Sequence, residues 1–235
     1  MIDMHSHVLP GMDDGAESVQ ESLEMLKDAY AQGVRTLVVT PHCHAFCEQD
    51  ISNFLDKRNK AYDELLKAIA QTDDSYPDII LGAEVALYRQ IVKLPSLKKL
   101  CIGNTDYILL EPMFENFSEQ IGEWIFEIGL KGMKPIVAHI DRYTDLALRK
   151  IGIFQLDAVL QLNASVFLSM YERRRVRKFL SEDKTFIIGS DMHNMKLRKC
   201  EIEKAYKRAK KMSSSEAENI FKNNAGQILG LEKEE

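Results

Sequence analysis

Histidines and carboxylates that are able to bind divalent metals recur along the chain in short motifs. IDMHSHVLPGMDDGA stands near the N-terminus, and TPHCH, GAEV, ILLEP, VAHIDRY and GSDMH follow. Imidazole and carboxylate ligands together suit manganese, iron or zinc better than calcium. The candidate metal ligands in these motifs are His5, His7, Asp14, His42, Glu84, Glu111, His139, Asp191 and His193.

The first motif has the spacing expected of a chelating pair on a strand. Side chains alternate along a strand, so Asp3, His5 and His7 are predicted to share a face, and two imidazoles at this spacing can bind one ion. Asp3 is then expected to orient one of the two imidazoles from behind.

The elements that position these residues are short apolar strands alternating with longer amphipathic helices. Strands are predicted at residues 2–5, 36–40, 78–81, 107–110, 135–138, 158–162 and 186–189. Helices are predicted at 18–33, 53–70, 119–129, 170–180 and 198–211, with a last one beginning at Ser215. Ser18 is the expected N-cap of the first helix and Gly33 its end.

Strand–helix alternation favours parallel pairing, either in a closed (β/α) barrel or in an open sheet. In a parallel barrel every strand ends at the same mouth, where active sites are built. Each candidate ligand stands at the end of a predicted strand or in the loop after it. The sequence therefore predicts a metal site at this end of one α/β domain.

Composition excludes several function classes. The chain has 235 residues, is 45% hydrophobic and has a net charge of −5 without a concentrated basic stretch. Nucleic-acid binding is not expected for such a chain. No membrane-spanning run or signal peptide is recognisable. Four cysteines without a disulfide framework fit the reducing cytoplasm, where the protein is expected to reside.

Three other features of the sequence indicate a function less strongly than the metal-binding motifs. The motif CHAFC has no second cysteine or histidine pair that would complete a structural zinc site. The basic residues of 173–178 are expected to form the solvated face of a helix, and a docking patch for an acidic partner is the less favoured alternative. No cysteine is followed six residues later by arginine, so the phosphate-binding loop of thiol phosphatases is missing.

Taken in order, the motifs resemble those of the PHP (polymerase and histidinol phosphatase) metallohydrolases. The stretches IDMHSHVLPGMDDGA, TPHCH, GAEV, LLEP, AHIDRY, QLNAS and GSDMHN carry the resemblance. They are similar in particular to the manganese-dependent protein-tyrosine phosphatases of Gram-positive capsule and exopolysaccharide loci. The resemblance implies a distorted seven-stranded (β/α)7 TIM-like barrel, formed by residues 1–235 as a single PHP domain.

The resemblance also implies a site with three divalent ions, manganese first and iron or zinc as alternatives. It assigns His5, His7, Glu84 and Asp191 to one ion, Glu84, Glu111 and His139 to a second, and Asp14, His42 and His193 to the third. Arg142 and Arg198 match the arginines that contact the phosphate in that family. The implied substrate is a phosphotyrosine protein, in particular a bacterial tyrosine autokinase that controls polysaccharide synthesis.

With the three ions that the resemblance implies, charge arithmetic also supports a phosphatase. Four ligand carboxylates against three divalent ions leave roughly +2 to attract a phosphate dianion. Water that bridges two metals is a nucleophile at neutral pH, so hydrolysis by a metal-bound hydroxide needs no protein nucleophile. A histidinol phosphatase, a phosphodiesterase or a nuclease would use the same ligands. A module whose metals only hold the fold is a further alternative, but it would not need a phosphate clamp.

Overall fold

The strands curl into a parallel half-barrel at the centre of one α/β domain. The computed structural model describes residues 1–113, 118 and 120–231. Within these residues all strand pairs are parallel, in one sheet of order β1-β2-β4 and one of order β3-β5-β6-β7-β8-β9. The strands are β1 Ile2–Ser6, β2 Thr36–Val39, β3 His42–Cys43, β4 Asp78–Leu81, β5 Glu84–Leu87, β6 Tyr107–Pro112, β7 Lys134–Val137, β8 Val159–Asn163 and β9 Phe186–Gly189.

The predicted count of seven strands is not confirmed, because two predicted strands are each followed by a short second one. β2 ends before Thr40 and Pro41, and β3 then joins the other sheet. Proline has no N–H to donate, which interrupts a ladder at this point. The segment between β2 and β3 stays hydrogen-bonded to the segment between β4 and β5 across this break. Gly82 N donates to Val39 O (2.8 Å), and Glu84 N donates to Pro41 O (3.1 Å).

The two sheets also meet on the other side of β1. Ser6 forms a parallel bridge with Met192, the residue three positions after β9. His7 N donates to Met192 O (2.9 Å), and Asp191 N donates to His5 O (2.8 Å). The end of β1, with His5 in the strand and His7 directly after it, therefore lies beside the loop that carries Asp191.

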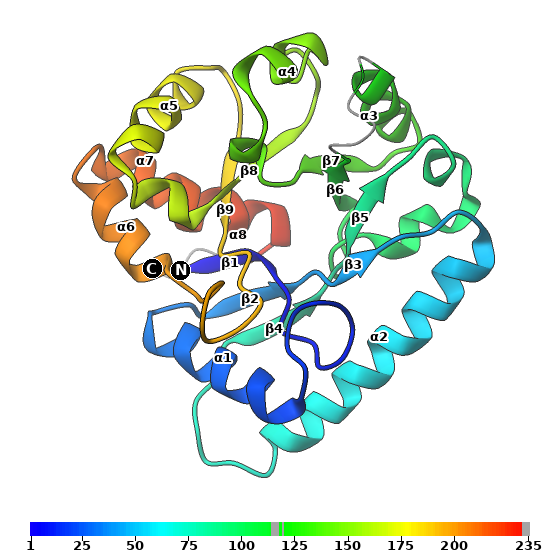
Figure 1. Cartoon of the computed structure of the whole chain (residues 1–235), viewed down its shortest axis with the longest axis vertical. Coiled ribbons are helices and arrows are strands. Elements are labelled where there is room, and N and C mark those ends of the chain that lie inside the picture. Colours follow the sequence, from blue (N-terminus) through cyan, green and yellow to red (C-terminus); the bar gives the residue numbers. More distant parts are fainter. Residues whose placement is uncertain (114–117, 119, 232–235) are drawn as a thin grey trace.

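Helices surround the strands, with α1 to α6 arranged around the outside in Figure 1. The N-cap prediction for the first helix is confirmed, because the Ser18 side chain accepts a hydrogen bond from Glu21 N (3.2 Å). Gly33, just beyond the end, has the left-handed φ of +87° that favours glycine. The helices are α1 Val19–Ala31, α2 Glu48–Ile69, α3 Gln120–Leu130, α4 Asp145–Lys150, α5 Met170–Leu180, α6 Ile202–Lys210, α7 Ser214–Glu218 and α8 Asn224–Leu229.

Several helix boundaries differ from the prediction. α2 begins five residues before the predicted position 53, because Asp50 caps its N-terminus by accepting hydrogen bonds from Phe46 N (2.8 Å) and Cys47 N (3.0 Å). The last predicted helix begins earlier too, with Ser213 as the N-cap of α7. Glu119, the predicted start of the third helix, lies outside the described residues. α4 was not predicted, and its six residues are too few to show a helical repeat.

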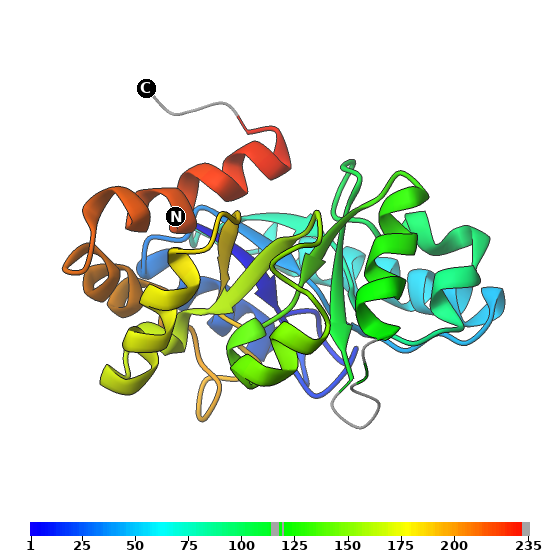
Figure 2. The same cartoon turned by 90° about the horizontal axis from the view of Figure 1, so that it is seen from above.

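A small apolar core lies inside the curled sheet. It contains Met4 of β1, Leu109 of β6 and Ile187 of β9, and Ala225 and Ile228 of α8 pack against them. Figure 2 shows α8 on one side of the strands and the loop after β9 on the other. The strands therefore end on the side away from α8. No helix among the described residues is long and apolar enough to cross a membrane.

Candidate metal centre

The nine predicted ligand positions converge where β1, β2, β4, β6, β7 and β9 end, and two of them, His42 and Glu84, are the first residues of the short strands β3 and β5. Neighbouring strands place them there even though the first and last are almost the whole chain apart. The distances that follow describe three overlapping groups that share His7, His42 and Glu84. His42 and Glu111 are half-buried and Asp14 is exposed, whereas the other six are buried: His5, His7, Glu84, His139, Asp191 and His193.

One group forms around the HxH pair of β1. The Nε2 atoms of His5 and His7 are 3.1 Å apart, and each lies 3.2 Å from Glu84 Oε2. Asp191 Oδ1 is 3.7 Å from the first imidazole nitrogen and 3.6 Å from the second. Two nitrogens bound to one ion at about 2.1 Å stand about 3 Å apart. This pair therefore has the separation of two ligands on one ion.

A second group forms around Glu84 and Glu111. His42 Nδ1 is 2.9 Å from Glu84 Oε2 and 3.8 Å from Glu111 Oε2. His139 Nε2 approaches the other oxygens, at 2.8 Å from Glu84 Oε1 and 3.4 Å from Glu111 Oε1. Glu84 thus faces the first group with one oxygen and His139 with the other, which is the arrangement of a bridging carboxylate.

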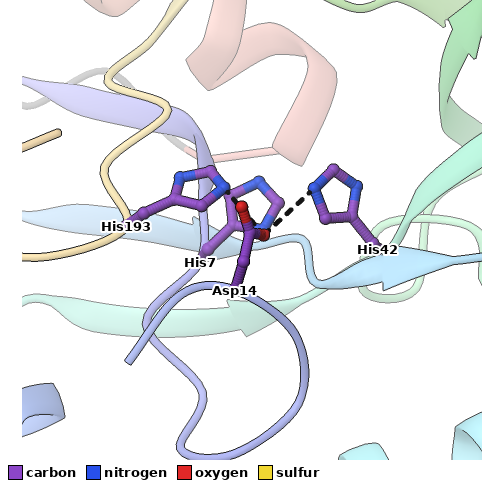
Figure 3. Close-up of side chains that lie close together, drawn as sticks. All are labelled: His7, Asp14, His42 and His193. Carbon is purple, nitrogen blue, oxygen red and sulfur yellow. Dashed lines mark ion pairs between the residues drawn. The ribbon is translucent and has the colours of Figure 1, made fainter. Parts of the chain in front are cut away.

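The third group is drawn in Figure 3 and combines His7, Asp14, His42 and His193. Asp14 Oδ1 lies 3.5 Å from His42 Nε2 and 3.3 Å from His193 Nε2. The imidazole rings of His7 and His193 stack with their centroids 3.8 Å apart. The exposed Asp14 carboxylate closes this group from the loop after β1.

Unpartnered buried atoms show that this donor set fits metal ions. His42 Nδ1, Glu84 Oε2 and His193 Nε2 are buried and make no hydrogen bond of acceptable geometry in the described part of the chain. Buried polar atoms nearly always have a partner, and each missing one costs about 1–3 kcal/mol. All three atoms point into the groups above, so divalent ions bound there would satisfy them.

Electrostatics within the site also favour cations. Burial lowers the pKa of His5, but the neighbouring Glu84 carboxylate outweighs it and raises this pKa to about 9. Burial raises the pKa of Glu84, yet the charge of His5 and hydrogen bonds from histidines hold it well below its usual value. Burial and the neighbouring His7 lower the pKa of His193 to about 4. The carboxylates thus stay ionised and gather positive charge around them.

Two residues that the sequence analysis did not single out orient the imidazoles. Asp13 Oδ2 is 2.8 Å from His7 Nδ1, and Gln161 Oε1 is 3.1 Å from His5 Nδ1. Burial raises the pKa of Asp13, but the hydrogen bond with His7 outweighs it and the pKa falls below its usual value. Both residues lie in quoted motifs, DDG and QLN, but motif membership alone does not show which side chain faces an imidazole.

The predicted role of Asp3 is wrong. Its Oδ1 accepts hydrogen bonds from the backbone N–H groups of His5 (3.2 Å) and Ser190 (2.8 Å) instead of from an imidazole. Asp3 pairs with Leu37 and Ser6 with Val39, so β1 holds one more residue than β2 over this stretch. An extra residue breaks the regular alternation of side chains on which the prediction relied.

Backbone conformation at the site is unusual. His139 (φ +30°) and Asp191 (φ +56°) are the non-glycine residues with positive φ in the described chain. Such residues cost of order 1–3 kcal/mol and cluster at functional sites. Close approach also requires Gly189, because a Cβ there would lie 2.4 Å from His5 Cβ and 2.8 Å from Gln161 Nε2.

Both predicted phosphate-contacting arginines lie at the site. Arg198 Nη2 donates to both oxygens of Asp191 at 2.9 Å, and Arg142 Nη2 donates to Asp191 Oδ2. Each side chain remains about one-third exposed. The two guanidinium groups therefore flank a buried carboxylate of the candidate centre while remaining open to solvent.

The CHAFC motif lies outside these groups. His44 is exposed and its Nδ1 lies 3.0 Å from Tyr88 Oη, while Cys43 is buried and Cys47 is the N-cap of α2. The prediction for the basic stretch is wrong for two of its residues. Arg173 and Arg175 are partly buried and bind backbone carbonyls, whereas Arg174, Arg177 and Lys178 are exposed.

Fold and site together define a parallel α/β protein with a candidate multinuclear metal centre at its strand ends. Residues 1–230 match the family model for capsular polysaccharide synthesis proteins CpsB/CapC. The tyrosine-protein phosphatase CpsB of Streptococcus pneumoniae is 30% identical in an alignment 249 residues long, which covers 97% of this chain and 98% of that protein. The tyrosine-protein phosphatase YwqE of Bacillus subtilis (strain 168) is 27% identical over 236 residues, which cover 97% and 91%.

A crystal structure from work on YwqE of Bacillus subtilis and CpsB of Streptococcus pneumoniae, which are metal-dependent tyrosine phosphatases, has the same fold. It aligns with a TM-score of 0.81 and 26% sequence identity, covering 99% of this chain and 96% of that one. The chain belongs to the CpsB/CapC family. The resemblance to capsule-locus tyrosine phosphatases that the motifs indicated is thereby confirmed.

Proposed function

We propose that this protein is a metal-dependent protein-tyrosine phosphatase. The observation that carries the proposal is the overlap of three imidazole and carboxylate groups on His7, His42 and Glu84, with Arg142 and Arg198 bound to Asp191 beside them. Its relatives, aligned over nearly their whole length, are named tyrosine-protein phosphatases.

The proposed cofactors are three divalent ions, with manganese as the expected metal. His5, His7, Glu84 and Asp191 would hold one, Glu84, Glu111 and His139 a second, and Asp14, His42 and His193 the third. The short distances within each set support this assignment, and the approach of His42 to Glu84 supports shared ligands between neighbouring ions. When bound, the ions would neutralise phosphate charge and lower the pKa of water so that it attacks phosphorus.

Arg142 and Arg198 would bind the phosphate itself. A guanidinium presents a planar fork of N–H donors that matches two phosphate oxygens, and it stabilises charge on the transferring group. Hydrogen bonds to Asp191 hold both arginines over the site before substrate arrives, so little side-chain ordering remains to be done.

The proposed substrate is a phosphotyrosine protein, in particular a bacterial tyrosine kinase of capsular or exopolysaccharide synthesis. The family description, capsular polysaccharide synthesis, supports that context. We place the enzyme in the cytoplasm, where its four cysteines, all free thiols here, would stay reduced.

Chelation and substrate comparison test the proposal. Protein stripped of metal should lose phosphotyrosine hydrolysis, and manganese should restore it more fully than magnesium or calcium. The restored enzyme should hydrolyse a phosphotyrosine peptide faster than histidinol phosphate or a phosphodiester. Metal-independent hydrolysis would contradict the assignment of the centre, and a preference for histidinol phosphate or the diester would replace the substrate class.

A further inference from the structure

A groove of about 530 Å³ opens beside the candidate centre, between the chain leading into α4 and the outer face of α5. Arg142, which reaches Asp191 in the centre, is also one of its lining residues. The groove therefore continues from the place where the phosphate is proposed to bind. Its other basic lining residues, Arg174, Arg175 and Lys178, all belong to α5.

Arg175 joins the groove rigidly to the loop that carries Arg142. Its Nη1 donates to Asp141 O (2.6 Å), its Nη2 donates to Tyr143 O, and its Nε donates to Asp145 Oδ1 (2.8 Å). Only 17% of this side chain is exposed. The groove and the proposed phosphate contact thus share one hydrogen-bonded framework.

Positive charge dominates the groove even after its internal ion pairs are formed. Asp145 is the acidic residue that lines it, and both Arg175 and Lys178 bind this carboxylate. Arg174 is exposed, and no carboxylate of the described residues lies within ion-pairing distance of it. The chain as a whole has a net charge of −5, so this basic groove runs against the overall charge.

We propose that this groove binds acidic residues flanking the phosphotyrosine of the protein substrate. The inference rests on the proposed phosphatase function, which brings the phosphotyrosine to Arg142 and requires the rest of the peptide to leave the centre along the surface. Exposed cations bind aspartate or glutamate side chains by charge complementarity, which improves association and selectivity. Tyr171 lines the same groove and is 77% exposed, so it offers an apolar wall for the peptide.

Charge reversal on α5 provides a test with a matched control. Arg174→Glu changes a groove residue, and Arg177→Glu makes the same change at an exposed residue of the same helix that does not line the groove. Steady-state kinetics on two phosphotyrosine peptides, one flanked by glutamates and one by serines, then give a ratio of kcat/KM for each protein. The measurements use the manganese-loaded full chain at low and high salt.

Wild-type enzyme should prefer the glutamate-flanked peptide, and Arg174→Glu should reduce that preference by about fivefold or more, mainly through KM. Arg177→Glu should keep the wild-type ratio, and high salt should weaken the preference. Equal ratios in all three proteins, or equal losses in both variants, would overturn the groove assignment and leave the phosphatase proposal intact. Failure of wild type to hydrolyse even the serine-flanked peptide would overturn both.

Discussion

Replacing Asp13 with asparagine tests whether a carboxylate outside the ligand set controls the metal centre. Asp13 Oδ2 faces His7 Nδ1 at 2.8 Å and accepts from His42 N at 2.9 Å, while Oδ1 accepts from Gly15 N at 2.9 Å. Every one of these contacts calls for an acceptor. An asparagine amide keeps only one oxygen, so its NH2 group must face a donor on one side or the other.

The size of the effect follows from these contacts. An unpaired buried donor costs about 1–3 kcal/mol, and an uncharged acceptor for His7 loses about 1 kcal/mol more. The sum, about 2–4 kcal/mol, is an upper limit for metal binding, because part of it destabilises the fold with or without metal. We therefore expect a loss of metal affinity of about 10- to 100-fold, the range found for residues that orient metal-binding imidazoles. Because Asp13 is not a predicted ligand itself, saturating manganese should restore most of kcat.

Competition with a chelator measures the manganese affinity, and phosphotyrosine hydrolysis at rising manganese concentration measures the recovery. Glu17→Gln, an exposed change in the same loop, is the control and should match wild type in both assays. Wild-type manganese affinity in Asp13→Asn would refute the reasoning. Activity that stays low at saturating manganese would show that Asp13 acts in the reaction and not through His7.

Three further predictions use the same assays. Alanine at Arg142 or Arg198 should lower kcat/KM by about 10²-fold with normal metal content, and lysine should rescue poorly, whereas near-wild-type kinetics would exclude a phosphate clamp. Gly189→Ala should lower metal content and destabilise the fold by about 1–3 kcal/mol, because the added Cβ would overlap His5. Gly129→Ala is the control: open space surrounds this position, so the melting temperature should not fall. The pKa of His5 is raised to about 9 without metal, so protons compete with manganese for this imidazole. Calorimetry should therefore show manganese binding that weakens as pH falls from 8 to 6 and that releases about one proton near pH 7. A manganese affinity that does not change with pH would contradict this prediction.

The sequence by itself predicted a candidate metal site and the side of the fold on which its residues meet. His5, His42, Glu84 and Asp191 stand at or just after the ends of predicted strands, and parallel strands end on one side of a sheet, so topology predicts that they meet. The structure places His42 and Glu84 at the start of β3 and β5, directly after the ends of β2 and β4. Local chemistry likewise marked α1, because Ser18 is a strong N-cap in any context. Predictions of this kind succeed because they depend on residue type and chain order.

Tertiary structure decided which neighbour does what. Asp13 and Asp14 are adjacent and chemically identical, yet the first faces His7 Nδ1 and the second faces His193. The loop that carries them folds back on the strand ends, where Ala16 N donates to His7 O (3.0 Å) and His42 N donates to Asp13 Oδ2 (2.9 Å). An extra residue in β1 turned Asp3 away from the imidazoles. Contacts between distant segments likewise set the left-handed backbone of Asp191, which no local pattern encodes. Such details depend on packing between segments far apart in the chain, and a residue's own neighbours in sequence do not determine them.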